Sequence, residues 1–180
     1  MARVPYVARG DLPESQRHFY DEIDNNRGRL NIYAAILNSP EAASCVGALG
    51  SYLRFQSQLP PQTRELAILT VAREMSCDYE WAQHKPVARS VGVSDPWIAA
   101  IRDGLTTNEI PHDQALVMRY VSELMHHHNV TDEMFNMVSK QLSTRDLVDL
   151  TLLVGYYMMV AITLLALKVE VDEDLVDKEN

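Results

Sequence analysis

The side chains best suited to chemistry in this sequence lie in one run of eight residues, 77–84 (CDYEWAQH). On a helix, positions i, i+3, i+4 and i+7 share a face, so Cys77, Glu80, Trp81 and His84 form one stripe. The stripe combines a thiol, a carboxylate and an imidazole beside a large aromatic ring. A helix face of this kind is normally packed with apolar side chains, so we take residues 77–84 as the candidate active site.

The start of this helix bears on the reactivity of Cys77. Ser76 fits the N-cap position, which would place Cys77 in the first turn. There the helix dipole favours a thiolate, whereas the neighbouring charge of Asp78 opposes one.

Glu65 is the fourth candidate, twelve residues before Cys77. It lies in a predicted helix, 62–74, whose run 66–72 is apolar all round and therefore buried. A carboxylate in such a helix is costly unless it is paired or hydrogen-bonded. Because the connection at Met75-Ser76 is short, the two helices should pack together, and Glu65 could then face the stripe.

Each candidate also has a purely structural interpretation. Cys77 could be a small buried hydrophobe, and Trp81 a core residue. Glu80 and His84 could form a helical ion pair worth a few tenths of a kcal/mol. Glu65 could stabilise the start of its own helix or pair with a nearby cation, namely Arg64, Arg73 or Lys85.

The remaining motifs carry less weight. The tract His126-His127-His128 cannot converge on one ion, because consecutive helical positions point about 100° apart. The run Tyr156-Tyr157-Met158-Met159 is typical of core packing, with tyrosine hydroxyls that need partners. The sequence has neither an HExxH motif nor paired cysteine spacing, so no metal is expected.

Composition narrows the class of protein. With 180 residues and 47% hydrophobic content, the chain can bury one core, and we expect a single domain, 1–180. The net charge of −9, without a Lys/Arg cluster, argues against nucleic acid as a partner. The N-terminus lacks an apolar segment behind a basic start, which favours a cytoplasmic protein. Two cysteines are too few for a disulfide framework, although an oxidised pair of Cys45 and Cys77 is left open.

One segment is apolar and long enough for a membrane span, residues 147–167. It carries Asp149, Thr151 and Thr163, and no second segment of this kind accompanies it. We therefore expect no membrane partner and interpret the segment as a helix buried in the core and in a subunit interface.

Start and stop signals predict an all-α protein of eight or nine helices. Pro86 should kink the helix that contains it or end it early. The charged tail 172–180 should be frayed. The predicted helices cover residues 13–24, 30–37, 40–58, 62–74, 77–91, 95–103, 111–127, 131–141 and 144–167.

The sequence resembles the carboxymuconolactone decarboxylase family, which includes the AhpD-type alkylhydroperoxidases. The resemblance rests on Arg64-Glu65-Leu66-Ala67-Ile68-Leu69, followed by Cys77-Asp78-Tyr79-Glu80-Trp81 and His84. It covers most of the chain and implies an AhpD-like helical bundle. Further matches are Leu12-Pro13, Tyr52-Leu53-Arg54-Phe55, Gly92-Val93-Ser94, Asp146-Leu147-Val148-Asp149-Leu150 and Gly155-Tyr156-Tyr157.

The resemblance implies two different reactions. The peroxidase branch has a glutamate at Glu65, a proton-relay histidine at His84 and a Cys-x-x-Cys pair. Here Cys77 matches the first cysteine of that pair, but Glu80 replaces the second, so no local disulfide can form. The decarboxylase branch resembles this chain at Tyr79-Glu80-Trp81 and at His84, and it typically needs no cysteine pair.

Our leading hypothesis is an enzyme that decarboxylates a small carboxylated lactone, or performs a related proton transfer, without a cofactor. His84 would donate or accept the proton, with Glu80 or Glu65 orienting it, and Cys77, Tyr79 and Trp81 would line the pocket. The alternative is a thiol peroxidase that uses Cys77, with Cys45 or an external thiol resolving it. A third possibility is a non-catalytic helical protein that binds a small molecule. The resemblance and the apolar last helix both imply a homo-oligomer, either a trimer or a hexamer.

Overall fold

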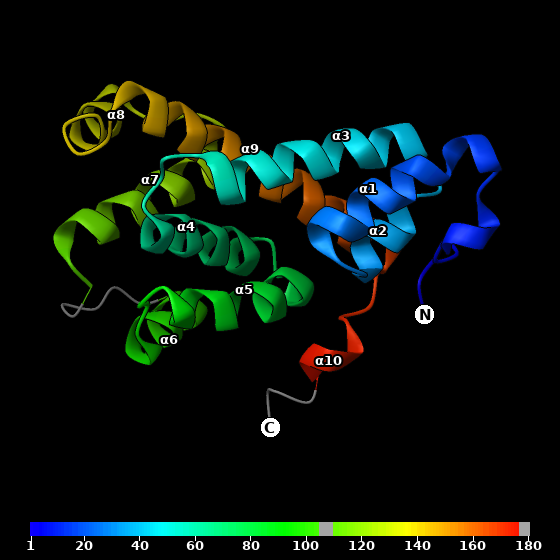
Figure 1. The fold of residues 1–180 in the computed structure, drawn as a ribbon. Helices are drawn as coiled ribbons and strands as arrows, with labels where there is room; N and C mark the ends of the chain where they lie inside the picture. Colours follow the sequence, from blue (N-terminus) through cyan, green and yellow to red (C-terminus); the bar gives the residue numbers. More distant parts are fainter. Residues whose placement is uncertain (105–109, 177–180) are drawn as a thin grey trace. The chain divides into compact units, whose positions relative to one another are not determined.

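The computed structural model describes residues 1–104 and 110–176. The regular secondary structure of these residues is entirely helical, with no strand among them (Figure 1). The all-α prediction is confirmed. The described α-helices are α1 (Arg17–Arg27), α2 (Asn31–Ile36), α3 (Pro40–Ser51), α4 (Pro61–Glu74), α5 (Asp78–Ser90), α6 (Asp95–Asp103), α7 (His112–His127), α8 (Asp132–Val138), α9 (Thr144–Leu167) and α10 (Glu173–Val176). Two 3-10 turns, η1 (Arg9–Asp11) and η2 (Glu14–Gln16), precede α1, and a π-helical segment, η3 (Tyr52–Gln56), follows α3.

The chain divides into two compact units, the first formed by residues 1–56 and 163–180. In this unit α1 and α2 both pack against α3. The segment after α9 is tied to the N-terminal part, where the N–H of Arg3 donates to the carbonyl of Leu167 at 2.8 Å. The carboxylate of Asp172 accepts a 2.7 Å hydrogen bond from the N–H of Asn31, one of the unpaired donors at the start of α2.

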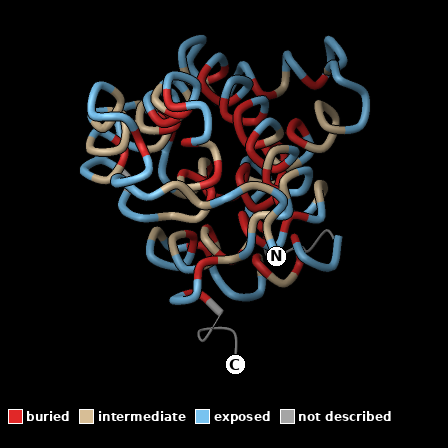
Figure 2. Tube along the Cα trace, turned by 90° about the vertical axis from the view of Figure 1, so that its right-hand side faces the viewer, coloured by how far each residue is buried: buried red, intermediate tan, exposed pale blue. Residues whose placement is uncertain are grey.

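The second unit, residues 57–162, is built around α4. This helix packs against α5, α6 and α7, and α7 in turn packs against α8. Leu66, Ile68 and Leu69 have no exposed surface, as predicted for a helix that is apolar all round. Within this unit, the hydroxyls of Tyr120 and Thr151 lie 2.7 Å apart and link α7 to α9. Buried and exposed stretches alternate along the helices, as amphipathic packing requires (Figure 2).

Several predicted boundaries were wrong. The helix expected over 40–58 is α-helical only to Ser51 and continues as the π-helical segment to Gln56. The prolines at 60 and 61 restrict the residues directly before them to extended backbone, so the helix stops before Leu59. Pro86 neither ends nor interrupts α5, which runs on to Ser90. The missing N–H of Pro86 removes one intrahelical hydrogen bond, while packing along α4 holds both sides of the helix in place.

The C-terminal tail is more ordered than expected. Asp172 is buried because its carboxylate binds the start of α2, and residues 173–176 form α10. The predicted fraying of residues 177–180 lies outside the described part of the chain.

The helix α9 is long and apolar enough to cross a membrane by length and composition alone, and 44% of its most apolar window is buried within the protein.

Candidate active site

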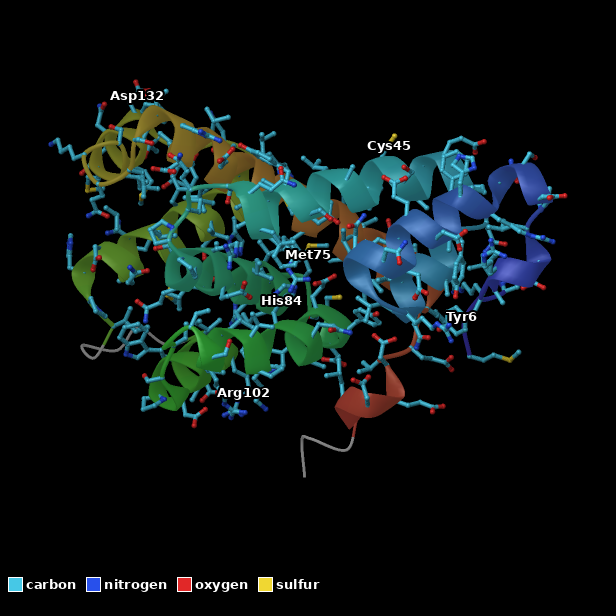
Figure 3. The ribbon with its side chains drawn as sticks, in the orientation of Figure 1. Tyr6, Cys45, Met75, His84, Arg102 and Asp132 are labelled. Atoms are coloured by element: carbon cyan, nitrogen blue, oxygen red, sulfur yellow. The ribbon has the colours of Figure 1, made fainter. Side chains whose placement is uncertain are left out.

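Glu65 and His84 meet in the interior of the second unit, where α5 packs along α4. Glu65 Oε2 lies 2.7 Å from Nδ1 of His84, and both residues are buried, with exposed fractions of 0% and 4%. An ionised carboxylate can only accept, so Nδ1 carries the proton and donates it to Glu65. Figure 3 labels His84 where α5 faces α4. The structure thus brings together the two residues whose approach the tight connection between the helices predicted.

The second nitrogen of His84 faces another carboxylate. Nε2 lies 3.5 Å from Oε2 of Glu80, one helical turn earlier on α5, and Glu80 is also buried. The Tyr157 ring from α9 packs against the imidazole in a T-shaped arrangement, with 5.0 Å between the ring centroids and an angle of 90°. The imidazole is therefore held by a carboxylate at each nitrogen and by an aromatic ring beside it.

A cation also contacts Glu65. Arg64 Nε contacts the other oxygen of Glu65 at 3.2 Å, so one cation and one anion already compensate each other. Because unpaired buried charge is strongly disfavoured, this cation helps Glu65 to remain buried as a carboxylate.

The environment keeps Glu65 ionised. Burial acts to raise the pKa of its carboxyl group, but the hydrogen bond from His84 and the charges of His84 and Arg64 outweigh burial, so the pKa falls below its ordinary value. Glu65 is therefore a partner of both Arg64 and His84, because each of its two carboxylate oxygens contacts one of them.

The environment of Cys77 differs from the expectation. Cys77 is itself the N-cap residue of α5, and Ser76 precedes the helix with a φ of 50°. Burial raises the pKa of the Cys77 thiol to about 11, and the charges of Glu80 and Asp78 act in the same direction, against the backbone N–H groups that favour the thiolate. The thiolate-favouring effect of the dipole, suggested by the sequence, is overcome by desolvation.

The two aromatic candidates are placed differently. Tyr79 is buried near the start of α5. Trp81 is half-buried and packs against an apolar core cluster, which agrees with its interpretation as a core residue. The cluster consists of Leu66, Leu69, Ala88, Val93, Ile98 and Ile101. The assignment of these aromatics to substrate binding remains a prediction.

Sequence reasoning missed the contact between Tyr157 and His84. The two residues are 73 positions apart, and the sequence pattern around Tyr157 indicates only core packing. The one signal was a tyrosine hydroxyl in an otherwise apolar run, because such a group needs a partner.

Of the three histidines 126–128, His126 contacts Glu74, with Nε2 to Oε2 at 3.4 Å, and is largely exposed. Among the described residues, no group of three His, Cys, Asp or Glu side chains is arranged to hold a metal ion.

Comparison with known proteins finds one family whose sequence pattern matches part of this chain, and several solved structures with a similar fold. The sequence pattern of the carboxymuconolactone decarboxylase family matches residues 40–117, the stretch that contains Glu65, Cys77, Glu80 and His84. The chain is similar over 97% of its length to an AhpD-core, peroxidase-related protein from Ralstonia eutropha JMP134, with a TM-score of 0.82, 15% identity and 94% of that protein covered. The chain therefore has the AhpD-like all-α fold.

Two further solved proteins share this fold. A peroxidase-related protein from Silicibacter sp. TM1040 matches 96% of this chain and 91% of its own, with a TM-score of 0.78 and 15% identity. The debrominase Bmp8 matches 97% of this chain and 94% of its own, with a TM-score of 0.78 and 12% identity. Bmp8 has also been solved with 2,3,4-tribromopyrrole. A search of curated proteins finds no significant match.

Proposed function

We propose that this AhpD-like protein is a cofactor-independent enzyme that decarboxylates a small carboxylated lactone or a similar enolisable acid, or moves a proton on it. The observation that carries the proposal is the position of His84 between two buried carboxylates, with Glu65 2.7 Å from Nδ1 and Glu80 3.5 Å from Nε2. A cytoplasmic setting is part of the proposal, and the two free cysteines support it.

The proposed reaction uses the Nε2 proton. The bond between carbon and the carboxylate breaks, its electron pair passes into an enolate, and carbon dioxide leaves. His84 then delivers a proton from Nε2 to the carbon, and a proton from solvent, relayed by Glu80, restores the starting state. Glu65 holds Nδ1 and thereby stabilises the imidazolium and fixes the direction of Nε2.

The state of Cys77 weighs against thiol chemistry. A peroxidatic cysteine must attack as a thiolate, and a pKa of about 11 leaves only about 10⁻⁴ of the thiol ionised at pH 7. The neighbouring carboxylate of Glu80 repels a further negative charge, and no second cysteine stands at position 80 to resolve an oxidised sulfur. A peroxidase reaction at Cys77 would require an environment that lowers the pKa of its thiol.

The proposal is tested by two variants against two substrates. Because the proton transfer needs the imidazole directly, His84→Ala should lower kcat/KM on a lactone acid by about 100-fold or more, while Cys77→Ser should stay within about tenfold. The assay is release of carbon dioxide. Rapid, thiol-dependent turnover of an organic hydroperoxide that Cys77→Ser abolishes would overturn the proposal. Turnover of neither substrate would instead favour a helical ligand-binding protein.

We also propose that the protein self-associates through one face of α9. Val148, Leu152, Met159 and Ile162 are 40–54% exposed, and with Gly155 they repeat at alternating intervals of four and three residues, the spacing of a helix–helix seam. A Cβ at Gly155 would meet nothing within 4 Å, so the chain's own packing does not require glycine there. Close approach of the same helix from a second copy accounts for a glycine that costs a helix about 1 kcal/mol relative to alanine.

A further inference from the structure

A cavity separate from the His84 group lies in the second unit between α4, α6 and α7. Its volume is about 170 Å³. The wall that α4 supplies includes Thr70 and Glu74, which lie about 140° and 180° around the helix from Glu65. None of the described lining residues belongs to the candidate active site, so the cavity is separate from the reaction proposed above.

The inner surface of the cavity is apolar. The helix α7 presents Ala115 and Met118 to it, α6 presents Ala100 and Ile101, and Ile110 completes the lining. An apolar cavity of about 150 Å³ is large enough to hold a benzene molecule. The volume here therefore suits one six-membered ring or a short branched chain.

The rim of the cavity is charged and predominantly basic. Among the described residues that line it, Arg73 and Arg119 are cationic and Glu74 is the one carboxylate. Arg119 continues the α7 stripe of Ala115 and Met118, at i+4 from Ala115, and has no ion pair with any described residue. In a chain of net charge −9, two arginines beside an apolar pocket are a local exception.

The position of Arg73 is set by its surroundings. Its Nη1 contacts Glu74 Oε1 at 3.3 Å, and a Cβ at Gly104 would overlap its guanidinium, so the group lies directly against the glycine backbone. Glu74 is already engaged by other donors, with Ser122 Oγ at 3.3 Å and His126 Nε2 at 3.4 Å. With two guanidinium groups against one carboxylate among the described lining residues, the rim keeps a net positive charge toward an entering anion.

We propose that this cavity is a binding site for a small aromatic or branched carboxylic acid, with its apolar part enclosed by the three helices and its carboxylate on Arg119 and Arg73. A guanidinium binds a carboxylate through two parallel hydrogen bonds, which selects the anion over a neutral compound of the same shape. The apolar lining selects ligands that carry a ring or branched chain over inorganic anions.

Benzoate and its neutral counterpart benzamide test the proposal on the full-length protein by isothermal titration and ligand-observed NMR. Benzoate should bind in the millimolar range, which is ordinary for a ligand of about nine heavy atoms, and benzamide at least tenfold more weakly. Arg119→Gln removes the anion contact and Ala115→Phe fills the cavity, so each should weaken benzoate at least tenfold.

Two control variants locate the site. Arg102→Gln removes an exposed arginine of α6 that pairs with Asp103 and does not line the cavity, so benzoate affinity should not change (Figure 3). His84→Ala should also leave it unchanged, and loss of binding in this variant would overturn the proposal by placing benzoate in the active site. No binding by the wild type up to 20 mM (about 20 times the expected constant), or equal binding by Arg119→Gln, would refute it as well. Circular dichroism and thermal unfolding verify that each variant is folded.

Discussion

Replacing Glu65 by glutamine tests the central contact of the candidate site without requiring knowledge of the substrate. The change keeps the shape of the side chain and removes its charge. The bond to His84 Nδ1 is 2.7 Å long and completely buried, and a hydrogen bond to a charged group is worth about 1.5–3 kcal/mol. Glu65→Gln should therefore lower the free energy of unfolding by about 2 kcal/mol at pH 7.

The pH dependence of this loss follows from the depressed pKa of Glu65. A carboxyl group whose pKa is lower in the folded protein stabilises it above the unfolded pKa of about 4.3, and this contribution disappears as pH falls through the folded value. The difference between wild type and Glu65→Gln should thus be constant above about pH 5 and shrink below about pH 4. Urea unfolding followed by circular dichroism across this range measures it.

A matched control is available on the same helix. Glu74 also pairs with a histidine, His126, but at 3.4 Å and with the histidine 60% exposed. Glu74→Gln should cost less than about 1 kcal/mol at every pH. If Glu65→Gln is as stable as Glu74→Gln, the buried pair is not held by charge and the reasoning fails. In the catalytic assay, a loss of about 10- to 150-fold in kcat/KM is expected for Glu65→Gln, and a loss below threefold would contradict the role of Glu65.

Three further outcomes are expected. In native protein at pH 8, iodoacetamide should alkylate the exposed Cys45 and spare Cys77, whose burial and pKa of about 11 suppress the thiolate; equal labelling in peptide mass spectra would contradict this. Leu152→Glu should reduce the mass measured by light scattering to that of a monomer, 20.4 kDa, whereas Phe135→Glu, an exposed apolar position on α8, should not. Asp172→Ala should lower the free energy of unfolding by about 1 kcal/mol through loss of the contact at the start of α2, and an unchanged urea midpoint would exclude that contact.

Helical periodicity predicted most of the fold because the relevant signals are local. Pro61 and Gly104 mark helix ends close to those observed, and the apolar run of α4 indicated its central position. The π-helical segment and the passage of α5 through Pro86 could not be predicted in this way. Both depend on packing that compensates for poor local hydrogen bonding, and such compensation comes from residues distant in sequence.

The candidate site was predictable to the extent that spacing along α5 and the short connection to α4 determine it. Glu80 and His84 lie one turn apart on the same helix, and Glu65 was identified from the cost of burying a carboxylate. The ionisation of Cys77 could not be predicted, because the helix dipole is visible in the sequence whereas the degree of burial is not. The contact of Tyr157 depends on where α9 returns in the fold, which no local pattern encodes.

Because the first unit contains both ends of the chain, it cannot be completed before the second unit during synthesis. Residues 57–162 form a compact unit from one continuous segment, so they can pack as soon as they leave the ribosome. Residues 1–56 emerge earlier, yet their unit includes residues 163–180, and the bond from Asn31 to Asp172 joins positions 141 residues apart. The first unit can therefore complete its folding only after residues 163–180 have been synthesised. Until then, apolar helix faces in residues 1–56 lack the packing that the end of α9 provides.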